Sequence, residues 1–267
     1  MRNVLSTLLL LACCHGGLAL AADPAQLSRG EGIATQAGCA GCHTPPGGAP
    51  YSGFQLGGWT AFNITTDPVA GIGDWSDQDL LAYLRTGHVN GKAQAGGPMA
   101  AIIENNTAVL SENDLAALAA YLRSSPAANP TGETRSRSAW GQAADDVDKI
   151  RGVSFDGPAM ASGARLYLGN CAACHGAHGQ GSDNGYYPSL VNNSAVGAAD
   201  AGNLVNVILH GQARTAQGLE YYMPGFAGAL SDGQVVSLAS YVLRRFGRPE
   251  VRVSLDDVKS RRGAGGQ

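Results

Sequence analysis

The chain has 267 residues, a net charge of −3 and only 15% charged residues. This length suits two small domains better than one large domain. Because there is no basic excess to neutralise phosphates, nucleic-acid binding is excluded. Glycine is abundant, at 38 residues, whereas aromatic residues make up 6%. Each domain is therefore short of the large side chains that build a core.

The N-terminus has the pattern of a secretory signal over residues 1–21. Arg2 supplies a positive charge, residues 8–12 are apolar, and Ala19-Leu20-Ala21 is a small-x-small cleavage site. We expect the mature chain to begin near residue 22. An alternative is a lipoprotein signal, because Leu10-Leu11-Ala12-Cys13 loosely resembles one. No later segment reaches the roughly 20 apolar residues of a membrane span, so an integral membrane protein is not expected.

The first half of the mature chain predicts a series of helices. A short glycine-containing helix over 27–37 precedes a Cys-x-x-Cys-His string at 39–43. Ser76 and Ser111 each stand at a cap position, with an acidic residue three positions later. They predict helices over 77–85 and 112–123. A Gly/Pro-rich loop follows the string, and a second loop, which carries Met99, lies between these two helices.

The second half repeats this order with an offset of 132 residues, from Cys39 to Cys171. A helix over 163–169 precedes a second Cys-x-x-Cys-His string at 171–175. Apolar residues then predict a helix over 200–210, and a loop with Met223 follows. The last predicted helix covers 232–245, with Ser231 at its cap position and Gln234 three residues later. We expect the first and last helices of each domain to cross, with small residues at the contact.

Two stretches lack this periodicity. Residues 126–158 contain prolines, glycines and mixed charges and read as a linker. Residues 248–267 read as a polar tail, for which a solvated, frayed terminus is favoured over a docking strip. The expected domains are therefore 22–125 and 159–247.

The two strings carry the chemistry. Cys-x-x-Cys-His is the attachment signature of c-type haem. The thiols of Cys39 and Cys42, or of Cys171 and Cys174, add across the vinyl groups of the cofactor. The adjacent histidine, His43 or His175, presents its imidazole to the iron. Two strings predict two covalently bound haems and a protein that moves electrons.

The remaining cysteines support this interpretation. Of the six cysteines, Cys13 and Cys14 lie in the signal and the other four belong to the strings. The alternatives are a redox dithiol or half a zinc site. Neither explains an immediate histidine, a duplicated motif and the absence of further cysteine ligands.

Each predicted domain contains one methionine in the loop before its closing helix. Met99 and Met223 occupy this place and each neighbours a proline, which stiffens the loop. A thioether opposite histidine raises the reduction potential of the iron and favours electron transfer. We expect Met99 and Met223 to be the second iron ligands; the alternative is that both only fill apolar space. His88 and His210 are rival ligands. His178 follows the second string too closely to reach the opposite face of the haem.

The residues resemble a known family. The segment 27–124 looks like a haem domain of the multihaem cytochrome c subunit of bacterial membrane-associated alcohol dehydrogenases, and 163–246 looks like the last haem domain of that family. The first match rests on a specific set of motifs: Gly58-Trp59, Asn63-Ile64-Thr65, Asp67, Gly71-Ile72-Gly73, Trp75-Ser76, Asp79-Leu80, Tyr83-Leu84-Arg85-Thr86-Gly87 and Gly97-Pro98-Met99. Similar subunits serve aldehyde, gluconate and sorbitol dehydrogenases. Well-known members have three haem domains, whereas this chain has two strings.

The resemblance implies an all-α protein with two tandem cytochrome c-type domains joined by a linker. It implies His43, Met99, His175 and Met223 as iron ligands and two covalent haems as cofactors. The expected protein is a periplasmic electron-transfer subunit, with peripheral association with the membrane open. A periplasmic dehydrogenase would donate electrons, and quinone or a terminal oxidase or cytochrome would accept them.

Two alternatives keep the same residues. A free dihaem shuttle cytochrome would have no fixed partner. A dihaem peroxidase would need one iron with an open or displaceable ligand position, which two candidate methionines disfavour. The type of the second iron ligand is the main discriminator.

Overall fold

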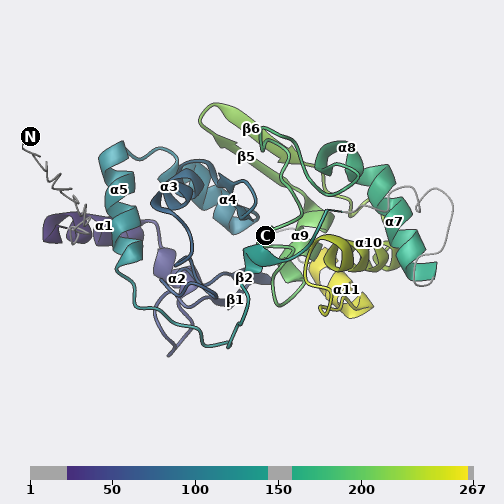
Figure 1. The fold of residues 1–267 in the computed structure, drawn as a ribbon, viewed down its shortest axis with the longest axis horizontal. Coiled ribbons are helices and arrows are strands. Elements are labelled where there is room, and N and C mark those ends of the chain that lie inside the picture. Colours follow the sequence, from purple (N-terminus) through teal and green to yellow (C-terminus); the bar gives the residue numbers. More distant parts are fainter. Residues whose placement is uncertain (1–22, 144–157, 264–267) are drawn as a thin grey trace, which may run out of the picture.

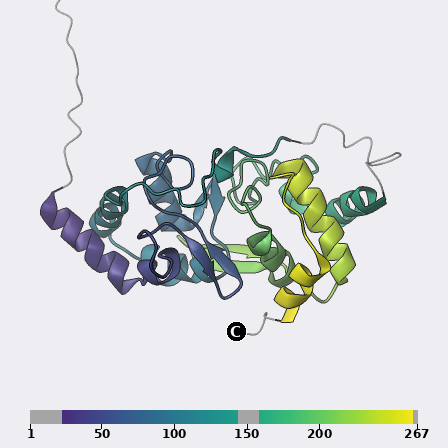
Figure 2. The same ribbon diagram turned by 90° about the horizontal axis from the view of Figure 1, so that it is seen from below.

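The protein is described here from a computed structural model that covers residues 23–143 and 158–263. Helices dominate, and two lobes lie side by side, the first half of the chain in one and the second half in the other (Figures 1 and 2). The predicted signal at 1–21 and its cleavage site lie outside the described residues. No helix among the described residues is both long enough and apolar enough to cross a membrane.

The first lobe contains the helices predicted from its sequence and two short antiparallel hairpins that were not predicted. Its hairpins are residues 54–61 and 88–94. The helices and strands of this lobe are α1 (Pro24–Gln36), α2 (Cys39–His43), β1 (Phe54–Leu56), β2 (Trp59–Ala61), α3 (Asp77–Thr86), β3 (His88–Val89), β4 (Ala93–Gln94), α4 (Pro98–Ile102), the π-helical turn η1 (Ile103–Thr107) and α5 (Glu112–Arg123).

The second lobe repeats the helical order and adds a longer hairpin. That hairpin extends from the second lobe towards the first (Figure 1). Its helices and strands are α7 (Pro158–Asn170), α8 (Ala172–His175), α9 (Gly202–His210), β5 (Gln212–Ala216), β6 (Leu219–Met223), α10 (Asp232–Phe246) and α11 (Leu255–Gly263). The 3₁₀ turn η2 (Arg137–Ala139) precedes this lobe.

The predicted serine caps are present. Ser76 and Ser231 each form a complete capping box, in which the side chain accepts from the third residue of the helix and that residue bonds back. Ser111 accepts from the backbone N–H of Asp114 at 3.2 Å. Each cap satisfies a donor that a helix start leaves without a partner, which explains why α3, α5 and α10 begin where they do.

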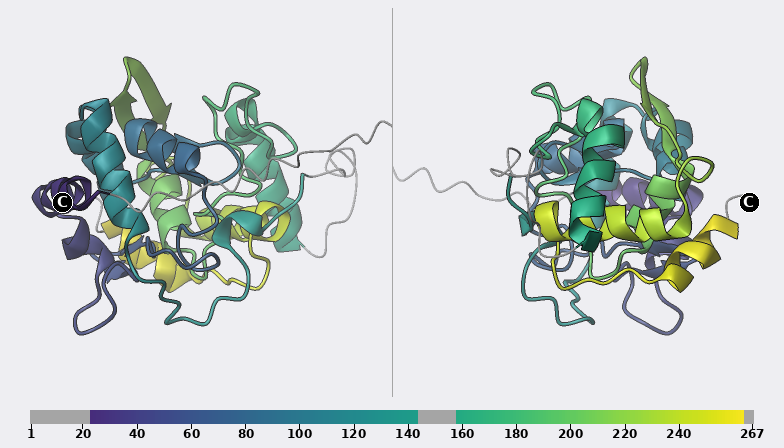
Figure 3. Two further views of the ribbon diagram at one scale, coloured as in Figure 1. Left: turned by 60° about the vertical axis from the view of Figure 1, so that its left-hand side comes forward. Right: turned by 90° about the vertical axis from the view of Figure 1, so that its right-hand side faces the viewer.

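The first and last helices of each lobe cross (Figure 3), and a glycine lies at each contact, where the sequence predicted small residues. A Cβ on Gly30 of α1 would lie 2.1 Å from the carbonyl oxygen of Ala117 in α5. A Cβ on Gly163 of α7 would lie 2.3 Å from the carbonyl oxygen of Ser237 in α10. No other residue permits backbones to approach this closely.

The described part of the linker, residues 126–143, packs against both lobes. Asn63 donates its side-chain amide to the carbonyl of Ala128 at 2.6 Å. Asn192 donates its backbone N–H to the carbonyl of Trp140 at 2.9 Å. Glu133 pairs with Arg248 at 2.9 Å, and both side chains are largely buried.

The prediction of a frayed C-terminal tail is wrong for the described part of it. Residues 255–263 form α11, which packs on α9 and α10 and buries Val258 completely. Arg262 pairs with Asp232 at 2.7 Å and also donates to the carbonyl of Leu230 at 2.9 Å. The sequence concealed this helix because one buried valine and a few ion pairs, rather than an apolar stripe, hold it in place.

Polar contacts join the lobes between β2 and the start of α9, beside a small apolar cluster around Ala216. Thr60 of β2 exchanges three hydrogen bonds with the second lobe: its N–H and its carbonyl bond the Asn203 side chain at 2.8 and 2.9 Å, and its hydroxyl donates to Asp200 at 2.9 Å. Asn206 donates to the carbonyl of Gly58 at 2.9 Å. Such a set of directional bonds fixes how one lobe sits against the other.

The crossing of α1 and α5 can be tested by adding one methyl group. We expect Gly30→Ala to lower the free energy of unfolding by about 1–3 kcal/mol, because the added carbon overlaps the backbone of α5. Gly32→Ala is the matched control, since nothing lies within 4 Å of a Cβ at that position of the same helix. Thermal unfolding followed by circular dichroism measures both. A loss of stability no larger for Gly30→Ala than for Gly32→Ala would contradict the crossing.

The docking of α11 gives a second test. Val258→Ala removes fully buried methyl groups and is expected to cost about 1–3 kcal/mol of unfolding free energy. Lys259→Ala, at the exposed neighbouring position, is expected to change stability by less than about 0.5 kcal/mol. Urea unfolding of the two variants measures the difference. Equal midpoints would mean that α11 is detached in solution.

Candidate haem sites

The second Cys-x-x-Cys-His string forms a tight helical turn that fixes its histidine. Cys171 caps α8, and His175 ends it. The Nδ1–H of His175 donates to the carbonyl of Pro188 at 2.8 Å, which leaves Nε2 as the free lone pair. Burial lowers the pKa of His175, although the Pro188 carbonyl opposes this. A neutral, oriented imidazole is the form that binds a metal.

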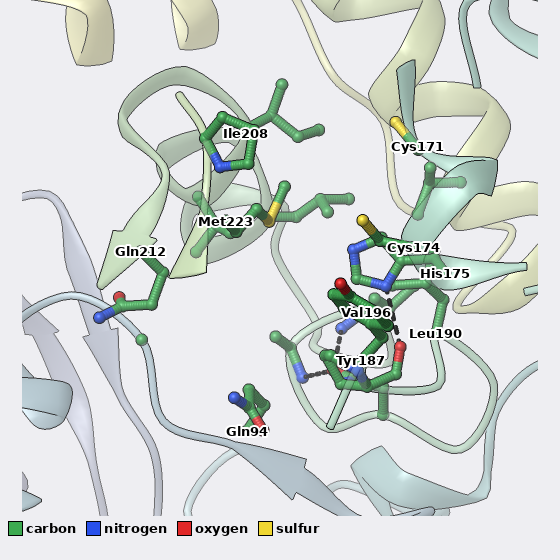
Figure 4. A pocket seen from close by; sticks show the side chains of 18 of the residues that line it. Gln94, Cys171, Cys174, His175, Tyr187, Leu190, Val196, Ile208, Gln212 and Met223 are labelled. Atoms are coloured by element: carbon green, nitrogen blue, oxygen red, sulfur yellow. Dashed lines mark hydrogen bonds between the residues drawn. The ribbon is translucent and has the colours of Figure 1, made fainter. Parts of the chain in front are cut away.

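The side chains predicted for the second site line a single cleft. Cys171, Cys174, His175 and Met223 border a space of about 1210 Å³, its open mouth included, with a mostly apolar wall. Met223 lies across this space from His175 (Figure 4).

The first string has the same local geometry. Cys39–His43 forms α2 after Gly38, whose positive φ of 71° starts the turn. The Nδ1–H of His43 donates to the carbonyl of Phe62 at 2.6 Å. Burial lowers the pKa of His43, the Phe62 carbonyl opposes this, and the charge of Arg137 lowers it further. This imidazole too is held neutral with Nε2 free.

Met99 lies at the start of α4 rather than in a loop. Its side chain is half-buried and packs against the buried cluster of Ala95, Ile103, Ala108 and Ala216. Gly97 precedes it with a φ of 52°, and a Cβ there would lie 2.5 Å from the Trp59 ring. This close approach of indole to backbone explains the Gly-Pro-Met sequence.

The cysteine environment argues against a redox dithiol. Burial is the main cause that raises the pKa of Cys39, and it raises the pKa of Cys171 to about 12. A catalytic dithiol needs a lowered thiol pKa. Among the described residues no group of three or more His, Cys, Asp or Glu side chains is placed to hold a metal ion.

The rival histidines have other partners. His88 bonds the Gln94 side chain through Nδ1 at 2.7 Å, at the seam between the lobes. His210 is exposed, and its Nε2–H donates to the carbonyl of Arg261 at 3.0 Å. His178 is exposed beyond the second string. None of these three lines the cleft of the second string.

The donor set fits haem c. Two thiols, a neutral imidazole with a free Nε2 and a thioether meet in one apolar cleft that lacks any carboxylate in its lining. A haem of the c type supplies one-electron oxidation and reduction when it is bound. The chain supplies attachment through the thiols, orientation through the histidine carbonyl bonds and exclusion of water through the apolar wall.

Sequence reasoning missed several residues of the second cleft. Gln94, Ala95 and Gly96 belong to the first lobe yet line the cleft of the second. Arg214 and Tyr221, from the long hairpin, also line it. No motif marked these residues, because they come together only when the lobes dock.

Both halves of the chain match cytochrome c families. The model described as "Cytochrome c" matches residues 27–126. The model described as "Cytochrome C oxidase, cbb3-type, subunit III" matches residues 158–242. The protein therefore contains two cytochrome c-type domains, which are the kind of domain that carries covalent haem c.

Curated relatives cover most of the chain. The fructose dehydrogenase cytochrome subunit of Gluconobacter japonicus is 39% identical over 86% of this chain and 50% of its own length. The alcohol dehydrogenase (quinone) cytochrome c subunit of Gluconobacter oxydans is 30% identical over 91% and 52%. The gluconate 2-dehydrogenase cytochrome c subunit of Pantoea cypripedii is 29% identical over 90% and 56%. The chain spans about half the length of these relatives.

Replacing the methionines tests their role as ligands. We expect Met99→Ala and Met223→Ala each to keep the haem attached but to lower one reduction potential by at least about 59 mV, a tenfold change in a one-electron equilibrium. Met160→Ala is the control, because Met160 is a core residue of the second lobe. Spectroelectrochemical titration measures the potentials. Unchanged potentials in a methionine variant would remove that residue from the ligand set.

Proposed function

Since the chain is similar over most of its length to cytochrome c subunits of dehydrogenases, we propose that it is the dihaem electron-transfer subunit of such a dehydrogenase. It carries two covalent haems, one in each of the predicted domains 22–125 and 159–247. These are tandem domains of the all-α cytochrome c type, with short hairpins added. The observation that carries the proposal is the cleft that joins Cys171, Cys174, His175 and Met223.

The proposed attachment uses Cys39 and Cys42 in the first domain and Cys171 and Cys174 in the second. His43 and Met99 would hold the iron of the first haem, and His175 and Met223 would hold the iron of the second. Histidine with methionine raises the potential and leaves no open position for substrate, which favours electron transfer over peroxide chemistry. The assignment of the two histidines is supported by their Nδ1 bonds to the Phe62 and Pro188 carbonyls.

The arrangement of the lobes supports electron flow between the two sites. The cleft of the second string has residues of the first lobe in its wall. On its outer rim, Tyr187 and Tyr222 are 38% and 69% exposed. One side of the second site thus adjoins the first lobe, and another side is open to an external redox partner.

The proposed donor is a dehydrogenase that oxidises a sugar, a sugar acid or an alcohol, the substrate classes in the names of the relatives. The proposed acceptor is quinone or a terminal oxidase or cytochrome. Covalent haem attachment requires export, so we place the protein in the periplasm, with residues 1–21 as its signal. Peripheral association with the membrane would bring it close to such acceptors.

Intact mass and co-purification test this function together. Expressed in cells that mature c-type cytochromes, the chain should carry two haem masses, and Cys171→Ala/Cys174→Ala should carry one. Co-expressed with the dehydrogenase encoded beside it, the untagged chain should co-purify and be reduced when the substrate of that enzyme is added. A chain that matures without haem would refute the cytochrome assignment. Two attached haems without any stable complex would favour the free shuttle instead.

A further inference from the structure

Arg214 is a buried cation at the junction of the lobes. It lies on β5, it is 3% exposed, and it lines the cleft that contains Cys171, Cys174, His175 and Met223. A charged side chain is almost never buried this fully without an opposite charge beside it. Because Arg214 lies in the wall of this cleft, the lack of an opposite charge beside it bears on what the cleft binds.

The contacts of Arg214 are all to neutral groups. Its Nε–H donates to the carbonyl of Thr86 at 3.0 Å, and the guanidinium carbon lies 4.1 Å from the centre of the Tyr221 ring. With its amide oriented to satisfy its neighbours, Gln94 accepts from both terminal nitrogens of Arg214, at 2.6 and 3.0 Å, and donates to His88. Gly87 packs directly against the guanidinium.

These contacts hold the guanidinium but leave its charge unbalanced. Among the described residues, no carboxylate forms an ion pair with Arg214. Glu104 acts on it only through weaker Coulomb attraction, and burial is the main cause that lowers the pKa of Arg214. The described lining of the cleft contains no Asp or Glu. A carboxylate on the occupant of the cleft would balance this charge.

We propose that Arg214 is the counter-charge for the carboxylate groups of the haem bound at the second string. The inference rests on the proposed function, because haem carries two propionate side chains, and the three attaching or ligating groups of the string, together with Met223, share this cleft with Arg214. An arginine fork suits a carboxylate in geometry and in charge.

This assignment links the second haem to the docking of the lobes. Thr86, Gly87 and Gln94, which hold the guanidinium, all belong to the first lobe. Arg214 itself belongs to the second lobe and faces the second site. The first domain thus positions a charge that stabilises the reduced iron of the other domain, since reduction removes one positive charge from the haem. Arg214 is a positioning residue for electron transfer rather than a ligand.

The test measures the two reduction potentials of the full haem-loaded chain. We expect Arg214→Gln to lower the reduction potential of the second haem by about 59 mV, which is a tenfold change in its one-electron equilibrium constant. The reduction potential of the first haem should change less. The second haem is identified by the potential that Met223→Ala moves. Arg165→Gln, which removes an exposed arginine of α7, controls for net charge and should leave both potentials in place.

Arg214→Lys separates charge from packing. It keeps the charge but loses the fork, so it should retain most of the potential that Arg214→Gln loses. If Arg214→Gln fails to mature, the lysine variant and its potentials still provide the comparison. Unchanged potentials in Arg214→Gln, with or without a fall in thermal stability, would mean that Arg214 has only a structural role and would overturn the proposal. An equal shift in Arg214→Gln and Arg214→Lys would also overturn it, because the charge would then be irrelevant. Either failure leaves the haem count, and so the proposed function, standing.

Discussion

The bond from a histidine Nδ1–H to a backbone carbonyl is the interaction on which both sites depend. It occurs twice, from His43 to Phe62 and from His175 to Pro188. It fixes the ring and selects the tautomer with Nε2 free, while burial lowers the pKa and keeps the imidazole neutral. The carbonyls come from loops 13–19 residues further along the chain, so the loop after each string has to fold back beneath it. The rest of each lobe holds that loop in place.

The two lobes use glycine for the same structural purpose. Gly30 and Gly163 allow the first helix of each lobe to contact the backbone of the last helix. This close crossing brings the chain ends of each lobe together and leaves the other face of the helix pair free to border the site. In the second lobe, Leu238 and Val242 of the closing helix indeed line the cleft. The small size of glycine at the crossing thus determines where the apolar side chains of the same helices gather.

The seam between the lobes combines directional polar contacts with a small apolar cluster, in which Ala216 of the second lobe packs with Ala95, Ile103 and Ala108 of the first. Thr60, Asn203 and Asn206 fix the register of the lobes through short hydrogen bonds. Because buried polar groups must find partners, such a seam permits one arrangement and penalises others. Arg214 belongs to the same seam, and so the electrostatic environment of the second site depends on how the lobes dock.

Local sequence determined the features that depend on near neighbours in the chain. The attachment strings, the serine caps of α3 and α10 and the glycine crossings follow from spacing and side-chain chemistry over a few residues. The hairpins and α11 escaped prediction because their stability comes from distant contacts, such as those of Val258 and Arg262. Only the tertiary structure decided which carbonyls orient His43 and His175, and which residues of one lobe complete the cleft of the other. The sequence pattern predicts which residues bind the cofactor but not which residues the docking of the lobes places beside them. Burial and pairing depend on the whole folded chain.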